Sequence, residues 1–301
     1  MLVISINPRT SASGHVNSGI GRKIFVIINT TLLAFLCAVI VYPVLHVIAC
    51  SFSEEVEILR GSVSFFPVSP QLNAYVKVFN YPQLWLSYRN TVFYTVAGTA
   101  INLFLTVSGA WVLSQKSLPG RRFLTLMCTF TMFFSGGMIP TFLVVKELRI
   151  LYTIWAILLP GAVSTYNLIL MRTFFMAIPQ SLVEAANLDG CTDFGILFRI
   201  VIPLSMASLM TIGMFYAVGH WNSYFSAVIY LNKSELYPLQ IILRQIVLQN
   251  EITENASSTE VNMAEGIKYA TIVVAMLPML IVYPFVQRFF VKGVMIGSVK
   301  E

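Results

Sequence analysis

Six long apolar runs, none of which contains Asp, Glu, Lys or Arg, constrain this chain more than any other feature. Each is close to the roughly 20 residues that an α-helix needs to cross the hydrocarbon core of a bilayer. Because lipid offers the backbone no hydrogen-bond partners, a spanning segment must satisfy its own amides, as a helix does. The sequence therefore predicts an all-α, polytopic membrane protein with six transmembrane helices, at Ile24–Ser51, Asn90–Ser114, Phe123–Val145, Tyr152–Met171, Val201–Leu231 and Tyr269–Val286.

Composition supports the membrane assignment. Hydrophobic residues make up 57% of the 301 and charged residues only 11%, whereas soluble domains average about 25% charged residues. Two runs carry marks of irregularity. The third contains Ser135–Pro140, SGGMIP, where paired glycines and a proline are expected to bend or break a helix. The fifth is longer than one span needs, so we expect it to include an interfacial segment.

The distribution of charge predicts the orientation. With six spans both termini lie on one side, and that side would carry more than half of the 19 basic residues, so the positive-inside tendency places it in the cytoplasm. We expect a cytoplasmic tail 1–23, a transmembrane domain 24–293 and a cytoplasmic tail 294–301. Further cytoplasmic and outer segments are predicted at 176–200, at 52–89 and at 232–265. The net charge of +6 follows from this topology and is no argument for binding nucleic acid.

The sequence lacks the motifs that are typical of catalytic, metal-binding and ATP-binding sites. There is no G-x-x-x-x-G-K-[ST] loop for ATP and no Cys-x-x-Cys, and no carboxylate pair or Ser/His/Asp set is positioned for chemistry. We therefore expect no catalytic residues, no metal and no cofactor in this chain. Ion-coupled carriers usually keep charged residues at mid-membrane, and the six runs contain no Asp, Glu, Lys or Arg. This weakens an ion-coupled mechanism but leaves Na⁺ coordination by backbone oxygens open.

Neutral polar residues do occur in the fourth and fifth runs. They either satisfy one another between packed helices or line a pathway, and the sequence favours neither. Aromatic rings beside amides and hydroxyls would suit sugars, whose C–H faces stack and whose hydroxyls need hydrogen bonds. The candidates for such a pathway are Tyr166, Asn167, His220, Trp221, Asn222 and Tyr224.

The cytoplasmic connector has the pattern of two short helices. Ser181 and Glu184 fit a capping box, with Ser181 as N-cap, and the first helix should end near Leu188. Asp189–Gly190 supplies the stop, with Gly190 in the left-handed conformation. Thr192 or Asp193 then caps a second helix.

Two apolar features follow from this pattern. Ala185 and Ala186 would leave a low surface on the first helix that a partner can approach closely. The second helix would present an amphipathic face of Phe194, Leu197, Phe198 and Val201.

These residues carry a resemblance to a known family. Glu184-Ala185-Ala186, three residues, Gly190, nine residues, then Ile200-Val201-Ile202-Pro203 is similar to the E-A-A motif of permease subunits of binding-protein-dependent ABC importers, with Ile202 in place of Leu. Nearly the whole chain resembles maltose-type carbohydrate permeases, especially the smaller maltose permease subunit. The stretches FSGGMIPTFLVVKELRILYT, LPGAVSTYNLILMRTFF and AVGHWNSYFSAVIYL resemble the branch that imports complex oligosaccharides, some of them polyuronates such as alginate or pectin fragments.

The resemblance implies a type I permease fold and import by alternating access across the bacterial inner membrane. It implies a second permease subunit, a dimer of ATP-binding subunits that holds ATP and Mg²⁺, a solute-binding protein and an oligosaccharide substrate. Residues 181–188 would form the coupling helix that docks on the ATPase, with the motif residues Ser181, Glu184, Ala185, Ala186, Asp189, Gly190, Ile200 and Pro203. The tail Gly293–Lys300 would also reach the ATPase, and the loop Asn232–Glu265 would probe the binding protein.

Two other classes remain open. One is an ion-coupled secondary sugar transporter, and the other is a membrane enzyme or a component for polymer export.

Overall fold

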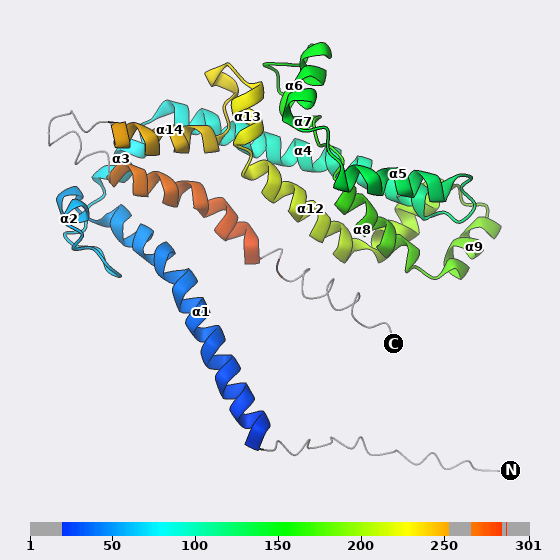
Figure 1. The fold of residues 1–301 in the computed structure, drawn as a ribbon, viewed down its shortest axis with the longest axis horizontal. Coiled ribbons are helices and arrows are strands. Elements are labelled where there is room, and N and C mark those ends of the chain that lie inside the picture. Colours follow the sequence, from blue (N-terminus) through cyan, green and yellow to red (C-terminus); the bar gives the residue numbers. More distant parts are fainter. Residues whose placement is uncertain (1–19, 253–265, 285–286, 288–301) are drawn as a thin grey trace.

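The computed structural model describes residues 20–252, 266–284 and 287, and every regular element within them is a helix. Three of these helices are long and apolar enough to span a membrane: α1 (Ile20–Phe52), α4 (Pro82–Ser114) and the last described helix, Gly266–Pro284. The number rises to six if each of three sharply bent helix pairs counts as one span. Helix α1 projects away from the other helices and shares little of their packing (Figure 1).

The first bent pair is α5 (Arg121–Phe133) and α6 (Met138–Glu147), which meet at 114°. The break falls inside SGGMIP, as predicted. Gly137 has φ +85°, a conformation that a residue with a side chain rarely adopts. The predicted third span is therefore two helices at a steep angle.

The prediction of one continuous span over Tyr152–Met171 is wrong. A short helix, α7 (Trp155–Leu158), ends before Pro160, and Gly161 follows with φ +75°. The chain becomes helical again only at α8 (Thr165–Met176), where the Ser164 side chain accepts a hydrogen bond from the backbone N–H of Asn167 at 3.4 Å. A local cap thus starts the helix well inside the apolar run.

Two further bent pairs shape the cytoplasmic connector that the sequence predicts. Helix α8 meets α9 (Gln180–Leu188) at 73°. Residues Asp193–Leu204, which comprise α10 (Asp193–Ile196), the π-helix η1 (Leu197–Val201) and α11 (Ile202–Leu204), meet α12 (Met206–Trp221) at 86°.

Short helices occupy the segments predicted as outer loops. Residues 52–89 contain α2 (Glu55–Leu59), α3 (Asn73–Phe79) and the first turns of α4. After α12 the chain forms α13 (Phe225–Tyr230), the 3₁₀ turn η2 (Ser234–Leu236) and α14 (Leu239–Ile252). The over-long fifth run thus ends in a separate short helix.

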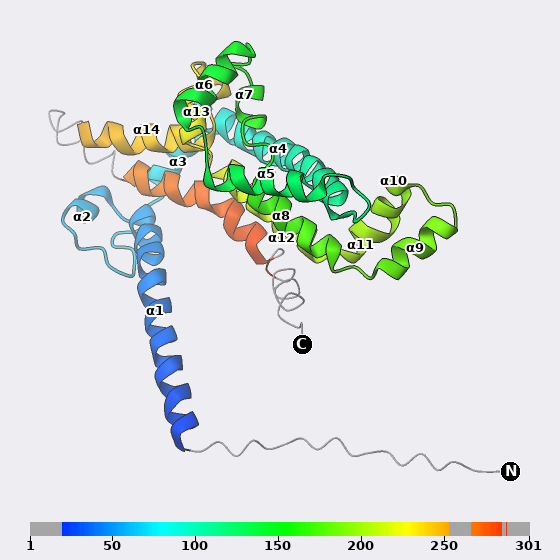
Figure 2. The ribbon, with the colours of Figure 1, turned by 45° about the vertical axis from the view of Figure 1, so that its right-hand side comes forward.

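Helix α4 is the centre of the fold and packs against both α8 and α12 (Figures 1 and 2). One core lies between these helices near their α9 ends, where Ala110, Trp111, Met171, Val201 and Ile212 are buried. In lipid no hydrophobic effect drives helices together, so association depends on close packing and interhelical hydrogen bonds. The helices of this core supply both.

Polar side chains inside this core satisfy one another. Thr106 of α4 and Tyr216 of α12 share a hydrogen bond of 2.7 Å between their hydroxyls, and the backbone N–H of Ser164 donates to the Tyr216 hydroxyl at 3.0 Å. The Asn102 amide accepts from His220 Nε2 at 3.0 Å, in the orientation that also lets it donate to the carbonyls of Gly98 and Ala162. These bonds join α4, α12 and the start of α8.

The other half of α4 holds the segment between α13 and α14 by side-chain bonds to backbone. Asn90 Nδ2 donates to the Glu235 carbonyl at 2.7 Å, and the Tyr94 hydroxyl donates to the Leu236 carbonyl at 2.9 Å. The Thr91 hydroxyl accepts from the backbone N–H of Leu239 at 2.8 Å. Non-helical backbone is thereby satisfied at a buried position.

Replacing Gly98 with alanine is expected to loosen the contact between α4 and α12. A Cβ at Gly98 would lie 2.8 Å from Cδ2 of His220 and closer still to two other ring atoms, so the ring and its bond to Asn102 must shift. We expect a loss of about 1–3 kcal/mol, measured as a lower midpoint of thermal unfolding in detergent.

Gly219→Ala is the matched control. A Cβ at Gly219, on the same helix as His220, meets no atom within 4 Å, and alanine favours a helix over glycine by about 1 kcal/mol. Equal unfolding midpoints for the two variants would contradict the packing described here.

Candidate functional site: the connector between α8 and α12

Helix α9 lies at one end of the molecule, remote from α2 and α14 (Figure 1). It begins at Gln180 with Pro179 as N-cap and makes no side-chain capping hydrogen bond. The predicted capping box of Ser181 and Glu184 is therefore wrong, because the helix starts two residues earlier than the box requires. Both side chains are exposed on the helix surface.

The end of α9 is the predicted glycine turn. Gly190 has φ +77°, its N–H donates to the Asn187 carbonyl at 3.1 Å, and the N–H of Cys191 donates to the Ala186 carbonyl at 3.0 Å. This pair of bonds is the Schellman motif, which satisfies carbonyls at a helix end and needs a residue that tolerates positive φ. Asp189 is the C-cap, so its position shapes the turn.

One face of α9 is anchored to the core. Ala186 is only 6% exposed, and Val183 packs with it against the cluster that contains Trp111, Phe175 and Ile196. The prediction that Ala185 and Ala186 both offer an accessible low surface holds for exposed Ala185 and is wrong for Ala186. The small side chain of Ala186 lets α9 lie close to the ends of α4, α8 and α10.

The other face of α9 is uncovered in the single chain and combines apolar side chains with the Glu184 carboxylate. Leu188 is 89% exposed, on the same side of the helix as Glu184 and Ala185, and Leu182 is exposed at the edge of this face. We call these four residues the α9 patch. Large apolar side chains this open are typical of surfaces that bind another protein or lipid.

The second helix begins as predicted but presents a different face. The Thr192 hydroxyl accepts from the backbone N–H of Gly195 at 3.3 Å and caps α10. Of the predicted amphipathic face, Leu197 and Val201 are buried, whereas Phe194 and Phe198 are exposed. The buried side of this helix consists of Ile196, Leu197 and Val201. It is therefore rotated about the helix axis by about one residue from the side that the sequence predicted.

Pro203 accounts for the shape of the chain after this stripe. A proline inside a helix lacks an N–H and its ring crowds the carbonyl four residues earlier, here that of Arg199. The helix widens to π geometry over Leu197–Val201 and breaks at Ser205, where it bends by 86° into α12. Ile200 is half-buried and Pro203 is exposed.

The residues proposed for a substrate pathway do not form one group. Tyr166 is exposed and Asn167 is buried, both on α8, whereas the others lie at the end of α12 and in the next turn. His220 is held by Asn102, and the Tyr224 ring lies 5.0 Å from the Arg244 guanidinium. Trp221 and Asn222 line a cavity of about 390 Å³ together with Gln240 of α14. Within the described residues, no cluster of His, Cys, Asp or Glu fits a metal ion.

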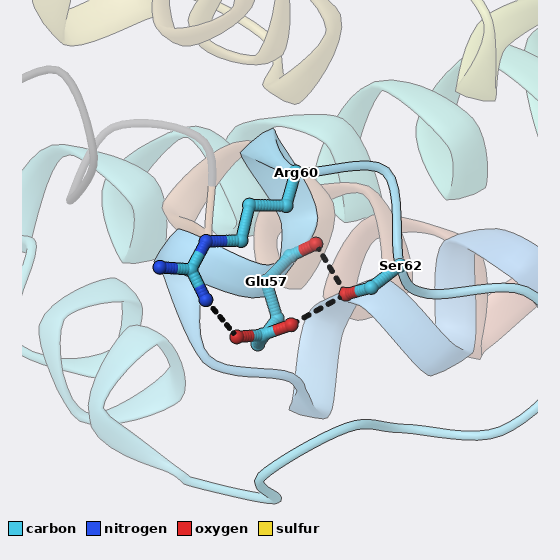
Figure 3. A network of polar contacts seen from close by, with 3 residues as sticks. All are labelled: Glu57, Arg60 and Ser62. Carbon is cyan, nitrogen blue, oxygen red and sulfur yellow. Dashed lines mark hydrogen bonds and ion pairs between the residues drawn. The ribbon is translucent and has the colours of Figure 1, made fainter.

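The opposite end of the molecule carries a polar network on α2 (Figure 3). The Glu57 carboxylate accepts from the Ser62 hydroxyl at 2.6 Å and from the Arg60 guanidinium at 2.9 Å. The hydrogen bond from Ser62, helped by the charge of Arg60, lowers the pKa of Glu57. Burial raises the pKa of its neighbour Glu55, partly opposed by Lys77. The segment between α1 and α4 thus has an ordered, charged surface.

Sequence reasoning missed a groove between α5 and α8, which we call the arginine groove. It has a volume of about 670 Å³, and its lining runs the length of α5, with two of its arginines where α5 begins. Its lining residues come from both helices and are Arg121, Arg122, Thr125, Leu126, Thr129, Phe130, Phe133, Phe134 and Arg172. From the sequence alone, Arg121, Arg122 and Arg172 contributed only to the count of basic residues that predicts which side of the membrane faces the cytoplasm.

Comparison with known proteins places this geometry in a family. Residues 88–296 match the model of the "Binding-protein-dependent transport system inner membrane component". The chain is 43% identical to the Protein LplC of Bacillus subtilis, over 94% of this chain and 97% of that protein. It is 44% identical to the polygalacturonan/rhamnogalacturonan transport system permease protein YtcP of the same organism, over 93% of this chain and 99% of the relative.

A solved structure has the same fold. The chain superposes with a TM-score of 0.83 on a chain from the crystal structure of a bacterial ABC transporter involved in the import of the acidic polysaccharide alginate. The two are 35% identical, and the match covers 90% of this chain and 98% of the other.

The turn at Gly190 makes a prediction that needs no partner. Gly190→Val places a β-branched side chain at φ +77°, which costs about 1–2 kcal/mol, whereas asparagine tolerates this conformation. Hydrogen exchange of the peptide around Cys191 should therefore be faster in Gly190→Val by about tenfold. In Gly190→Asn it should stay close to that of the unmodified chain, and equal rates in both variants would contradict the turn.

Proposed function

This chain belongs to the family of binding-protein-dependent transport system inner membrane components, and on that premise we propose that α9 is the helix through which an ATP-hydrolysing subunit drives it. The chain is a permease, a multi-pass membrane protein of this class of transporter. The observation that carries the proposal is the construction of α9, which is anchored by Ala186 and Val183 on one face and presents the α9 patch on the other.

A helix that docks on an ATPase can transmit the movement of that ATPase to the membrane helices only if it is fixed rigidly to them. The Schellman turn at Gly190 and the contacts of Ala186 tie α9 to α10 and to the ends of α4 and α8. Closure of a partner ATPase dimer, which would hold ATP and Mg²⁺, would then displace these helices as a body. Such rigid-body movement can expose a central cavity to alternate sides of the membrane.

The fold is also consistent with a second permease subunit. Helix α1 spans 33 residues and its most apolar stretch buries nothing within this chain, so its surface is available to lipid and to another subunit. We propose a heterodimer with a related permease, with the transport pathway between the two. The pathway residues suggested by the sequence, among them Trp221 and Asn222, remain candidates for its outer half.

The proposed substrate is an oligosaccharide, delivered by a solute-binding protein at the outer face. Relatives that transport polygalacturonan and rhamnogalacturonan, and a neighbour that imports alginate, support acidic sugars as the class. We propose the bacterial inner membrane as the location, with both termini in the cytoplasm on the side of α9. The tail Gly293–Lys300 and residues 253–265 of the outer loop, which the sequence also assigns to partners, lie outside the described residues.

An ion-coupled carrier is the alternative from another class. It would take up the sugar on an ion gradient without ATP and would need no partner at α9. The exposed Leu188 and the anchored Ala186 favour the ATP-driven reading, since a carrier that works alone has no use for a large uncovered leucine on a fixed helix at this end.

Cross-linking tests the proposed contact directly. In a chain whose four native cysteines are replaced, a cysteine at Ala185 should form a disulfide with a cysteine placed in the helix-binding cleft of the ATPase subunit, as judged by gel shift of the assembled transporter. Val163→Cys is the control, since Val163 is exposed but lies at the opposite end of α8. Failure to cross-link at Ala185, or equal cross-linking at both positions, would count against docking at α9.

A charge in the α9 patch should uncouple transport. In Leu188→Asp we expect ATP-driven uptake by the reconstituted transporter to fall by more than tenfold, because a carboxylate would be buried without a partner in the docked interface. Leu72→Asp adds the same charge at an exposed leucine near α3 and should leave uptake close to normal. Normal uptake by Leu188→Asp would show that the patch is not the docking surface.

A further inference from the structure

The arginine groove concentrates positive charge that the chain itself does not neutralise. Arg172 Nε donates to the Leu113 carbonyl at 2.9 Å, and Arg121 Nη2 contacts Met176 Sδ at 3.5 Å. A guanidinium has five N–H donors, so most remain available. Within the described residues, neither these two arginines nor Arg122 has a carboxylate within ion-pair distance, and no acidic residue lines the groove.

Hydroxyls and aromatic rings continue the groove along α5. Arg121, Thr125 and Thr129 recur every four residues and are half-buried on the side of α8. The two threonine hydroxyls donate to backbone carbonyls one turn earlier, so their lone pairs remain free to accept. Beyond them the rings of Phe130 and Phe134 stack with centroids 4.4 Å apart.

This sequence of groups matches an acidic sugar better than a lipid headgroup. A lipid with its headgroup at the arginines would place an acyl chain against Thr125 and Thr129 and leave the acceptor lone pairs of their hydroxyls unused, whereas a sugar can donate to them. Carboxylates pair with guanidinium groups through charge-assisted hydrogen bonds. Sugar hydroxyls can donate to the threonines, and the C–H faces of pyranose rings can lie on phenylalanine rings. The volume of about 670 Å³ is in the range of small-molecule sites.

We propose that the arginine groove is a binding site for the carboxylates of an anionic oligosaccharide, at the α9 end of the transport pathway. The inference rests on the proposed function and deepens it by naming the side chains that would select an acidic sugar. Arg121 and Arg172 bind carboxylate, Thr125 and Thr129 bind hydroxyls, and Phe130 and Phe134 support a sugar ring.

The test measures binding to the assembled transporter without its solute-binding protein, in nanodiscs made only of zwitterionic phosphatidylcholine. Trigalacturonate and its fully methyl-esterified form, which lacks the negative charges, are titrated by calorimetry at low ionic strength. The unmodified transporter should bind the acid more tightly than the ester. The double variant Arg121→Gln/Arg172→Gln should weaken acid binding by about tenfold or more.

Two control variants separate recognition from general damage. Arg199→Gln removes the same charge from an exposed arginine at the same end of the molecule, outside the groove, and should leave acid binding unchanged. Arg121→Lys/Arg172→Lys keeps the charge and should retain the preference for the acid over the ester. Loss of acid binding in this lysine variant equal to that in the glutamine variant would mark the arginines as structural and overturn the proposal.

Other outcomes overturn the proposal as well. They are equal binding of acid and ester by the unmodified transporter, unchanged acid binding in the glutamine variant, or no acid binding at all. If the unmodified transporter binds no acid but carries phosphatidylglycerol that the glutamine variant does not retain, the groove holds a lipid headgroup.

A second experiment separates failure of this inference from failure of the proposed function. It measures uptake of labelled trigalacturonate by proteoliposomes that contain ATP and the complete transporter. ATP-driven uptake without binding at the groove defeats this inference alone, whereas uptake on an ion gradient without ATP defeats the proposed function.

Discussion

The close packing of α4 against α12 and α8 is the interaction on which the rest of the structure depends. Gly98 lets α12 approach until the His220 ring lies against the α4 backbone, and the bonds of Asn102 and Tyr216 allow only one register. In a bilayer the hydrophobic effect does not hold helices together, so shape and hydrogen bonds must do so. The same helix α4 also carries the side chains that order the segment before α14.

This packing gives α9 a mechanical connection to the core of the chain. Ala186 lies in the same buried cluster as Trp111 of α4 and Ile212 of α12, and the turn at Gly190 joins α9 to the helix that leads into α12. Pro203 and the π-helix before it bend the chain so that α12 enters the core at a steep angle. A displacement of α9 is therefore expected to carry α4, α8 and α12 with it, including the arginine groove.

The sequence predicted those features that follow from composition or from a short motif. An unbroken uncharged run was sufficient for α1 and α4, and the spacing of Glu184, Gly190 and Pro203 located the connector and its left-handed turn. The start of α8 was missed because it depends on a local cap at Ser164 and on the Tyr216 hydroxyl from another helix. The arginine groove was missed because Arg121 and Arg172 are distant in sequence and meet only when α5 packs on α8.

Helix α9 and the membrane core are expected to move as one body when a partner ATPase binds ATP. The direct measurement is the distance between spin labels at Asn187 of α9 and Phe104 of α4, both exposed, by pulsed electron resonance in the assembled transporter. We predict the same mean distance and width without nucleotide and with ATP trapped in the closed ATPase. A shift of this distance on ATP binding would show that α9 moves independently as a flap, and would contradict the account.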